Sequence, residues 1–229
     1  MARTGHGPTL PGMGVVILVR HGQASFGSED YDVLSETGWS QGHRLGAWFA
    51  ERGLAPTAVV QGGMRRHRET AEAAGWTDPT TDPGWDEFDH LAVVAADPDL
   101  PSGDLDRREF QRAFEVATAR WTSGAFDGEY AEPWPAFRAR VTAALDRARE
   151  QAGPGGTVVV VTSGGPIAAA CAALVDPEAD DAGFARLWSR LNTVLVNASY
   201  SRVVVGSTGA RLLTFNEHPH LDGAALTYR

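Results

Sequence analysis

Two runs of consecutive apolar, mostly β-branched residues limit most narrowly what this chain can fold into. They cover residues 15–19 and residues 158–161. A strand with one face in water alternates apolar and polar residues, whereas a strand that is covered on both faces is apolar throughout. The two runs therefore predict central strands of a parallel sheet with helices packed on both of its faces.

The remaining segments alternate between helical and extended patterns. Helices are expected over residues 35–52, 64–74, 105–121, 135–151, 166–174 and 182–191, and further strands over residues 58–60, 193–199, 201–205 and 211–215. The last two strands are joined by a glycine-containing turn and are expected to form a hairpin. Residues 76–104 are rich in Pro, Gly and Asp and are expected to be irregular. Strands that alternate with helices indicate an α/β fold, a three-layer α/β/α sandwich with a mostly parallel central sheet.

The length of 229 residues favours one domain. Residues 1–13, rich in Gly, Pro and Thr, are expected to form a flexible leader, and residues 14–229 a single domain. The one cysteine, Cys171, excludes an intrachain disulfide framework. No apolar run approaches the ~20 residues that span a bilayer, and no signal-peptide pattern is present, so a cytoplasmic location is expected.

The charge balance argues against a polyanionic partner. The chain has 20 Lys and Arg against 29 Asp and Glu, a net charge of −9. Such a surface repels nucleic-acid backbones and anionic membranes, and neither is expected as a partner. A small anion remains possible, because a few clustered arginines can form a local positive pocket.

Polar residues follow both apolar runs directly. Arg20, His21 and Gly22 come after the first run, and residues 162–165 (Thr-Ser-Gly-Gly) come after the second. Ligands of open α/β sheets bind beyond the carboxyl ends of parallel strands. A neutral imidazole can act as a nucleophile, an arginine can fork two hydrogen bonds to an anion, and glycine allows close approach of a ligand. Taken alone, this tripeptide fits a structural histidine equally well.

The wider pattern resembles the histidine phosphatase superfamily, the phosphoglycerate-mutase-like group. The first run and its exit continue to Leu34, Ser35, Glu36, Thr37, Gly38 and Gln41 in the manner of that family's opening signature. Arg66 stands four residues before Thr70-Ala71, as in the family's next block, and an acidic segment follows at residues 85–89. Asn216 and His220-Leu221 resemble its C-terminal strand exit. The resemblance covers about residues 15–222.

The resemblance implies a role for each of these residues. His21 would attack phosphorus and carry the phosphoryl group, and Arg20 and Arg66 would bind its oxygens. Glu87 would protonate the leaving oxygen and then activate water, with Asp86 and Asp89 as alternatives to it. No metal and no cofactor are implied. Arg65 and Arg68 are interpreted as a solvated helix face, and His67, His90 and His218 as surface residues.

Two positions depart from the family pattern. Ser163 stands where the family usually has a second histidine that donates a bond to the phosphoryl oxygen. Ser163 and Gly164, at a helix N-terminus that favours anions, are expected to bind the phosphate, with water or His218 as a substitute donor. The other departure is Gly27, where many members have asparagine. The substrate pocket is therefore expected at Gly22, Gln23, Ser25 and Phe26, under an insert over about residues 88–135.

The sequence as a whole indicates a metal-independent phosphomonoester hydrolase that acts on a small phosphorylated molecule through a phosphohistidine. A catalytically weak phosphate-binding or regulatory protein of the same fold is the alternative that Ser163 raises. A phosphoglycerate mutase is a further alternative. A homodimer is possible.

Overall fold

The computed structural model describes residues 12–25, 32–100 and 107–228. Its strands are β1 (Gly14–Arg20), β2 (Ala58–Gln61), β3 (Thr80–Thr81), β4 (Thr157–Thr162), β5 (Tyr200–Gly206) and β6 (Gly209–Glu217). Its α-helices are α1 (Glu36–Glu51), α2 (Arg65–Ala73), α3 (His90–Ala95), α4 (Arg107–Thr122), α5 (Trp134–Ala152), α6 (Gly164–Val175) and α7 (Asp181–Val194). Short 3₁₀ turns cover Pro83–Trp85, Asp127–Glu129 and Gly223–Ala225. The expected leader lies outside the described residues up to position 11.

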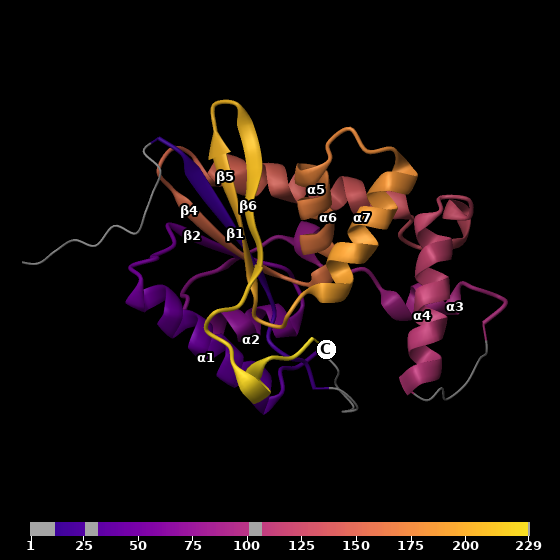
Figure 1. The fold of residues 1–229 in the computed structure, drawn as a ribbon, viewed down its shortest axis with the longest axis horizontal. Helices are drawn as coiled ribbons and strands as arrows, with labels where there is room; N and C mark the ends of the chain where they lie inside the picture. The colour runs from indigo at the N-terminus through magenta and orange to yellow at the C-terminus, as the bar shows by residue number, and fades with distance from the viewer. Residues whose placement is uncertain (1–11, 26–31, 101–106, 229) are drawn as a thin grey trace, which may run out of the picture.

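The sheet has the strand order β3-β2-β4-β1-β5-β6 (Figure 1). The pairs β3–β2, β2–β4 and β4–β1 are parallel, and β1–β5 and β5–β6 are antiparallel. The sheet is therefore mixed, with the parallel pairs on the side that holds both apolar runs. Antiparallel β5 and β6 form the expected hairpin, in which Gly206 pairs with Gly209.

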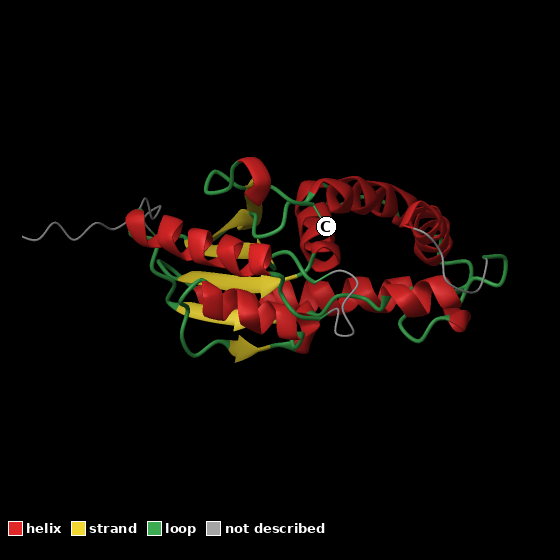
Figure 2. Cartoon of the chain, turned by 90° about the horizontal axis from the view of Figure 1, so that it is seen from below, coloured by secondary structure: helices red, strands yellow, loops and turns green. Residues whose placement is uncertain are grey.

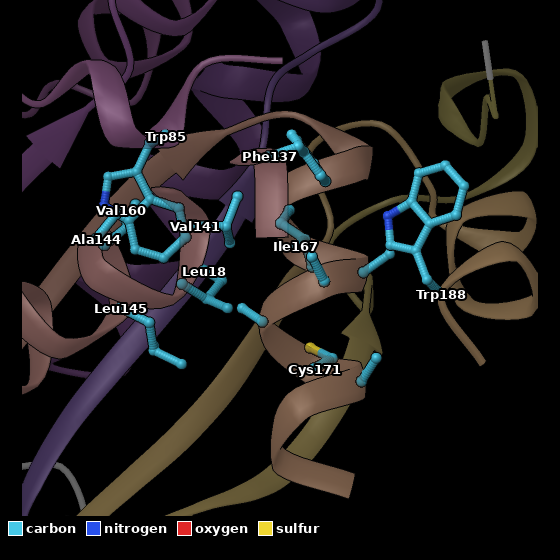
Figure 3. Packing of buried hydrophobic residues seen from close by; sticks show 14 of the residues in the cluster. Leu18, Trp85, Phe137, Val141, Ala144, Leu145, Val160, Ile167, Cys171 and Trp188 are labelled. Carbon is cyan, nitrogen blue, oxygen red and sulfur yellow. The ribbon is translucent and has the colours of Figure 1, made fainter. Parts of the chain in front are cut away.

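Helices cover both faces of the sheet, which confirms the three-layer α/β architecture (Figure 2). Ile17 and Val19 of β1 pack with α1 and α2, whereas Val16 and Leu18 belong to the core cluster on the other face. That larger cluster is closed by α5 and α6, whose Val141 and Ile167 lie near Leu18 in Figure 3. Both faces of β1 are thus buried, as its unbroken apolar sequence predicted.

Two of the expected elements differ in the structure. The strand expected over residues 193–199 is wrong, because α7 continues to Val194 and an irregular turn follows it. The side chain of Asn216 shapes this turn: its Nδ2 donates to the carbonyl of Val194 at 2.7 Å, and its Oδ1 accepts from the amide of Val196 at 2.9 Å. The region expected to be irregular contains α3, capped by Asp89.

Helices α3 and α4 pack against each other at one side of the molecule, beyond α7 as seen in Figure 1. Aromatic side chains join α4 to the rest of the molecule: Phe88 stacks on Trp121 of α4 with ring centroids 4.7 Å apart, and Trp121 contacts Trp134 of α5 and Trp188 of α7. Among the helices of the described residues, none is long and apolar enough to cross a membrane.

Candidate active site

The exits of β1 and β4 lie side by side. Arg20 is in register with Thr162, and the amide of His21 donates to the carbonyl of Thr162 at 2.9 Å. The next residue on each strand exit is therefore His21 on one side and Ser163 on the other. The two polar segments that the sequence placed at strand ends meet at the same edge of the sheet.

The imidazole of His21 is held in one orientation by its own loop. Its Nδ1 lies 2.6 Å from the carbonyl oxygen of Gly22, so the Nδ1 proton donates there and Nε2 carries the lone pair. The ring is buried, and burial together with the positive charges of Arg66 and Arg20 lowers the pKa of His21 well below its usual value. A neutral ring with an oriented lone pair is the form that can attack an electrophile.

Arg66 is buried in the first turn of α2 and points to the same edge of the sheet. Its Nη1 forms an ion pair with Asp32 at 2.8 Å, and its Nη2 lies 3.5 Å from Ser163 Oγ. Arg20 is partly exposed, and its Nη1 donates to the carbonyl oxygens of Leu195 and Tyr228. The two guanidinium groups are the cations whose charge acts most strongly on His21.

Glu87 reaches the N-terminus of α6 from the loop after the first 3₁₀ turn. Its Oε2 accepts from the amide of Gly165 at 3.0 Å, and a Cβ on Gly165 would stand 2.1 Å from its Oε1, so only glycine admits this approach. Thr162 Oγ1 donates to the carbonyl of Trp85 and ties this loop to β4. Desolvation raises the pKa of the Glu87 carboxyl, and this effect is larger than the lowering of the pKa by the Gly165 amide and by Arg66.

The two neighbouring carboxylates are engaged elsewhere. Asp86 accepts from the amide of Gly63, and Asp89 caps α3 by accepting from the amide of Ala92 at 2.9 Å. Of the three acidic residues that the sequence left open, Glu87 is the one hydrogen-bonded to the α6 N-terminus. Its ionisation is also linked to Arg66 and Arg20, which act on His21 as well.

Ser163 has an unexpected neighbour. His67, interpreted from the sequence as a surface residue, is fully buried, and its Nε2 lies 2.7 Å from Ser163 Oγ. Its ring centroid is 5.8 Å from that of His21. Within the described residues, the histidine beside Ser163 is thus His67, whereas His218 contacts the carbonyl of Asn216. His90 is likewise partly buried rather than exposed.

The loop from Gly22 to Ser25 packs on α1 and on the segment before it. A Cβ on Gly22 would lie 2.5 Å from the carbonyl oxygen of Gly38, so glycine is required here by helix packing, a reason the sequence did not indicate. Gln23 accepts through Oε1 from Ser35 Oγ at 3.0 Å, and the amide of Ser25 donates to Val33 at 2.8 Å. Phe26 and Gly27 lie outside the described residues.

Three residues of the site were missed in the sequence. Thr70 accepts from the amide of Gly22 at 3.0 Å and donates to the carbonyl of Arg66 at 2.7 Å, so it fixes α2 against the His21 loop. Gly165 admits Glu87, and His67 contacts Ser163. For His67 and Thr70 the signal was their helical spacing with Ala71 and Ala74, which marks one buried face of α2 and its C-cap residue. Gly165, in α6, had no such signal.

The site consists of a neutral imidazole, buried cationic and hydroxyl groups, and a carboxyl with a raised pKa. Such a set can bind a tetrahedral oxyanion, attack it and exchange a proton with it. In the described parts of the chain, no cluster of three or more His, Cys, Asp or Glu side chains could hold a metal ion.

Comparison with known proteins finds the family that the sequence pattern resembles. Residues 16–218 match the sequence model of the histidine phosphatase superfamily, branch 1. No curated protein sequence matches the chain significantly. Among solved structures, phosphoglycerate mutase from Bacillus anthracis is similar at 18% identity and a TM-score of 0.62, covering 96% of this chain and 97% of that one.

Two phosphatases are also similar. The mycobacterial glucosyl-3-phosphoglycerate phosphatase has 23% identity and a TM-score of 0.57, covering 89% of this chain and 98% of that one. A mutant of phosphoserine phosphatase from Entamoeba histolytica, in complex with phosphoserine, has 15% identity and a TM-score of 0.64, covering 91% and 99%. At these identities the likeness shows the shared fold.

Proposed function

Because the chain belongs to the histidine phosphatase superfamily, we propose that it is a metal-independent hydrolase of small phosphomonoesters that works through a phosphorylated His21. The observation that carries the proposal is the buried imidazole at the exit of β1, whose Nδ1 is held by the carbonyl of Gly22 and whose pKa is lowered by burial. Solved neighbours that are named as phosphatases support a phosphatase-type activity.

In the first step, Nε2 of His21 attacks the phosphorus atom and the bond from phosphorus to the ester oxygen breaks. Glu87, whose pKa is raised by desolvation, acts as the acid and gives its proton to the departing oxygen, which leaves as an alcohol. Arg66, Arg20 and the Ser163-Gly164 end of α6 stabilise the phosphoryl oxygens, on which charge is spread in the transition state.

In the second step, the ionised Glu87 accepts a proton from a water molecule, and the oxygen of that water attacks the phosphorus. The bond between phosphorus and Nε2 breaks, inorganic phosphate forms, and His21 regains its lone pair. Glu87 ends protonated, so the enzyme is ready for another cycle. The segment over residues 88–135, with α3 and α4, would cover the site and select the alcohol part of the substrate.

The direct test replaces His21 with alanine and measures turnover of 4-nitrophenyl phosphate at about pH 6. Removing a nucleophile lowers kcat by roughly 10⁴-fold or more. His43→Ala, on the exposed face of α1, is the matched control and should leave turnover unchanged. Unaltered turnover of the folded His21→Ala protein would contradict the mechanism.

A phosphate-binding protein with little turnover is the second candidate. Two observations favour it: a serine occupies position 163, and the carboxylate of Asp32 already engages Arg66. This candidate predicts that the protein binds orthovanadate and that no phosphoester in a broad panel is hydrolysed. A mutase would instead transfer the phosphoryl group to a phosphoglycerate in preference to water.

A further inference from the structure

The turn that carries Glu87 is held from outside by α5, through a side chain that the proposed mechanism does not use. The turn covers residues 82–87, and Arg140 of α5 lies against it. Nη1 of Arg140 donates to the carbonyl of Asp86 at 2.8 Å and to that of Gly84 at 3.1 Å. The carbonyl of Asp86 belongs to the peptide bond that joins this residue to Glu87. Arg140 therefore fixes the backbone from which the candidate acid projects.

The backbone of this turn depends on side chains for its hydrogen bonds. The carbonyls of residues 84–86 follow one another and accept from side-chain donors. Arg140 donates to the first and the third, and Thr162 Oγ1 donates to the second. Trp85, in the middle, is fully buried beside α5, as Figure 3 shows. Because a carbonyl that is shielded from water needs a donor, we expect the turn to change its path when Arg140 is lost.

The guanidinium of Arg140 is itself held in one geometry by Glu132. Its Nε and Nη2 donate to the two carboxylate oxygens of Glu132 at 2.7 and 2.9 Å, a forked pairing. The two side chains are only 24% and 32% exposed, so water and salt screen this pair less than an open surface pair. Since the guanidinium is planar, the fork leaves Nη1 one direction, toward the turn.

The position of Glu132 is fixed in turn by α4. Its carbonyl accepts from Nε1 of Trp121 at 2.9 Å. The ring of Trp121 also stacks on Phe88, the residue after Glu87. One path of contacts therefore runs from α4 through Glu132 and Arg140 to the peptide before the candidate acid. A second path runs through the Trp121 ring to the residue after it.

The carboxyl of Glu87 has fixed partners at its own end. The amide of Gly165 donates to Oε2 at 3.0 Å, and the amide of Phe88 donates to Oε1 at 3.2 Å. The guanidinium charge of Arg140 acts on the pKa of Asp86, which it lowers. Arg140 thus reaches Glu87 through the backbone, and a carboxyl that is tied at both ends has little freedom to move.

We propose that Arg140 and Glu132 form a positioning pair for the acid: the fork holds Nη1 of Arg140 on the carbonyl of Asp86, which keeps the Glu87 carboxyl where it can protonate the leaving oxygen. Both are positioning residues, since they act through Glu87. A displacement of about 1 Å at such a group can lower a rate about 10²-fold. The inference rests on the proposed function and names the residues that set the place of its acid.

The test measures kcat/KM of full-chain variants with phenyl phosphate and with 4-nitrophenyl phosphate. This quantity covers the steps up to departure of the phenol, and the less acidic phenol is the one that needs protonation. Arg140→Met keeps an apolar stem without the donors and should lower kcat/KM for phenyl phosphate about 10²-fold, with a much smaller loss for 4-nitrophenyl phosphate. Glu132→Gln breaks the charged fork and should give the same selective loss to a smaller extent.

The variant E87Q/R140M separates positioning from general packing. It should have the same kcat/KM for phenyl phosphate as Glu87→Gln, because Arg140 acts only through the acid. Arg138→Met is the matched control, since Arg138 also lies on α5, is 25% exposed and pairs with Asp181. It should leave the ratio of the two kcat/KM values unchanged. Thermal unfolding shows whether each variant is folded, and should Arg140→Met misfold, Glu132→Gln carries the comparison.

The two proposals fail in different ways. Equal losses with both substrates, an unchanged ratio in folded Arg140→Met, or a further loss on adding this substitution to Glu87→Gln would overturn the Arg140–Glu132 pair. If His21→Ala retains turnover, the phosphohistidine mechanism fails instead, whatever Arg140 does.

Discussion

Gly165→Ala tests how the candidate acid is held. The new Cβ would lie 2.1 Å from Oε1 of Glu87 and 3.1 Å from a ring carbon of Phe88. Because such contacts are normally no shorter than about 3 Å, the carboxyl must shift by about 1 Å, a displacement that can lower a rate about 10²-fold. The hydrogen bond from the Gly165 amide to Oε2 is lengthened or lost as the carboxyl moves.

The assay compares two substrates that differ in the acidity of the leaving group. Phenyl phosphate releases a phenol with a pKa near that of tyrosine, about 10, and requires protonation of the departing oxygen. 4-Nitrophenyl phosphate releases a far more acidic phenol and requires little help. Gly165→Ala should therefore lower kcat for phenyl phosphate about 10²-fold and that for 4-nitrophenyl phosphate much less.

Gly128→Ala is the matched control, because a Cβ there has nothing within 4 Å and should change neither rate. Equal losses with both substrates would show that the substitution disturbs the site in general. Parent-like turnover of phenyl phosphate by folded Gly165→Ala would refute the assignment of Glu87 as the acid.

Three further predictions concern the groups around His21. Burial lowers the pKa of His67 below 6.5, so below this pH the unfolded chain binds more protons than the folded chain. The free energy of unfolding should therefore fall as the pH drops below about 6.5, by up to about 1.4 kcal/mol per pH unit for this histidine. Urea unfolding at several pH values should give a shallower dependence of the unfolding free energy on pH for His67→Phe than for the parent, and an equal dependence would contradict this. Thr70→Val leaves the buried amide of Gly22 without its acceptor and should cost about 1–3 kcal/mol of unfolding free energy, measured in urea; an unchanged unfolding free energy would contradict this role of Thr70. Ser163→His alone should lower thermal stability and activity, because its ring would overlap His67, and combination with His67→Ala should restore both; a fully stable single variant would argue against this packing.

The sheet and its helices were predictable from the sequence because burial on both faces leaves an unmistakable apolar pattern. The runs at residues 15–19 and 158–161 became β1 and β4, and their exits meet as the rule for parallel strands requires. The strand expected over residues 193–199 was wrong because the turn there depends on Asn216, some twenty residues further on. A local pattern contains no sign of such a contact.

His67 shows why part of the site was not predictable. It stands among Arg65, Arg66 and Arg68, and that charge pattern indicates an exposed helix face. Its burial is decided by the α6 N-terminus, which only the fold brings near. The sequence could not decide between the adjacent carboxylates of Asp86 and Glu87 for a similar reason. The direction of the backbone after Trp85 determines that Glu87, not Asp86, reaches Gly165.

The most direct measurement of the central claim is the identification of the phosphorylated residue during turnover. The protein is mixed with excess 4-nitrophenyl phosphate, whose phenol leaves with little help from an acid. It is then quenched in base, in which phosphohistidine survives, and analysed by mass spectrometry of its peptides. The account predicts a phosphoryl group on His21 of the parent, absent from His21→Ala and present at a higher level in Glu87→Gln, whose second step lacks its base. A phosphoryl group on another residue, or rapid turnover by His21→Ala with no adduct, would contradict it.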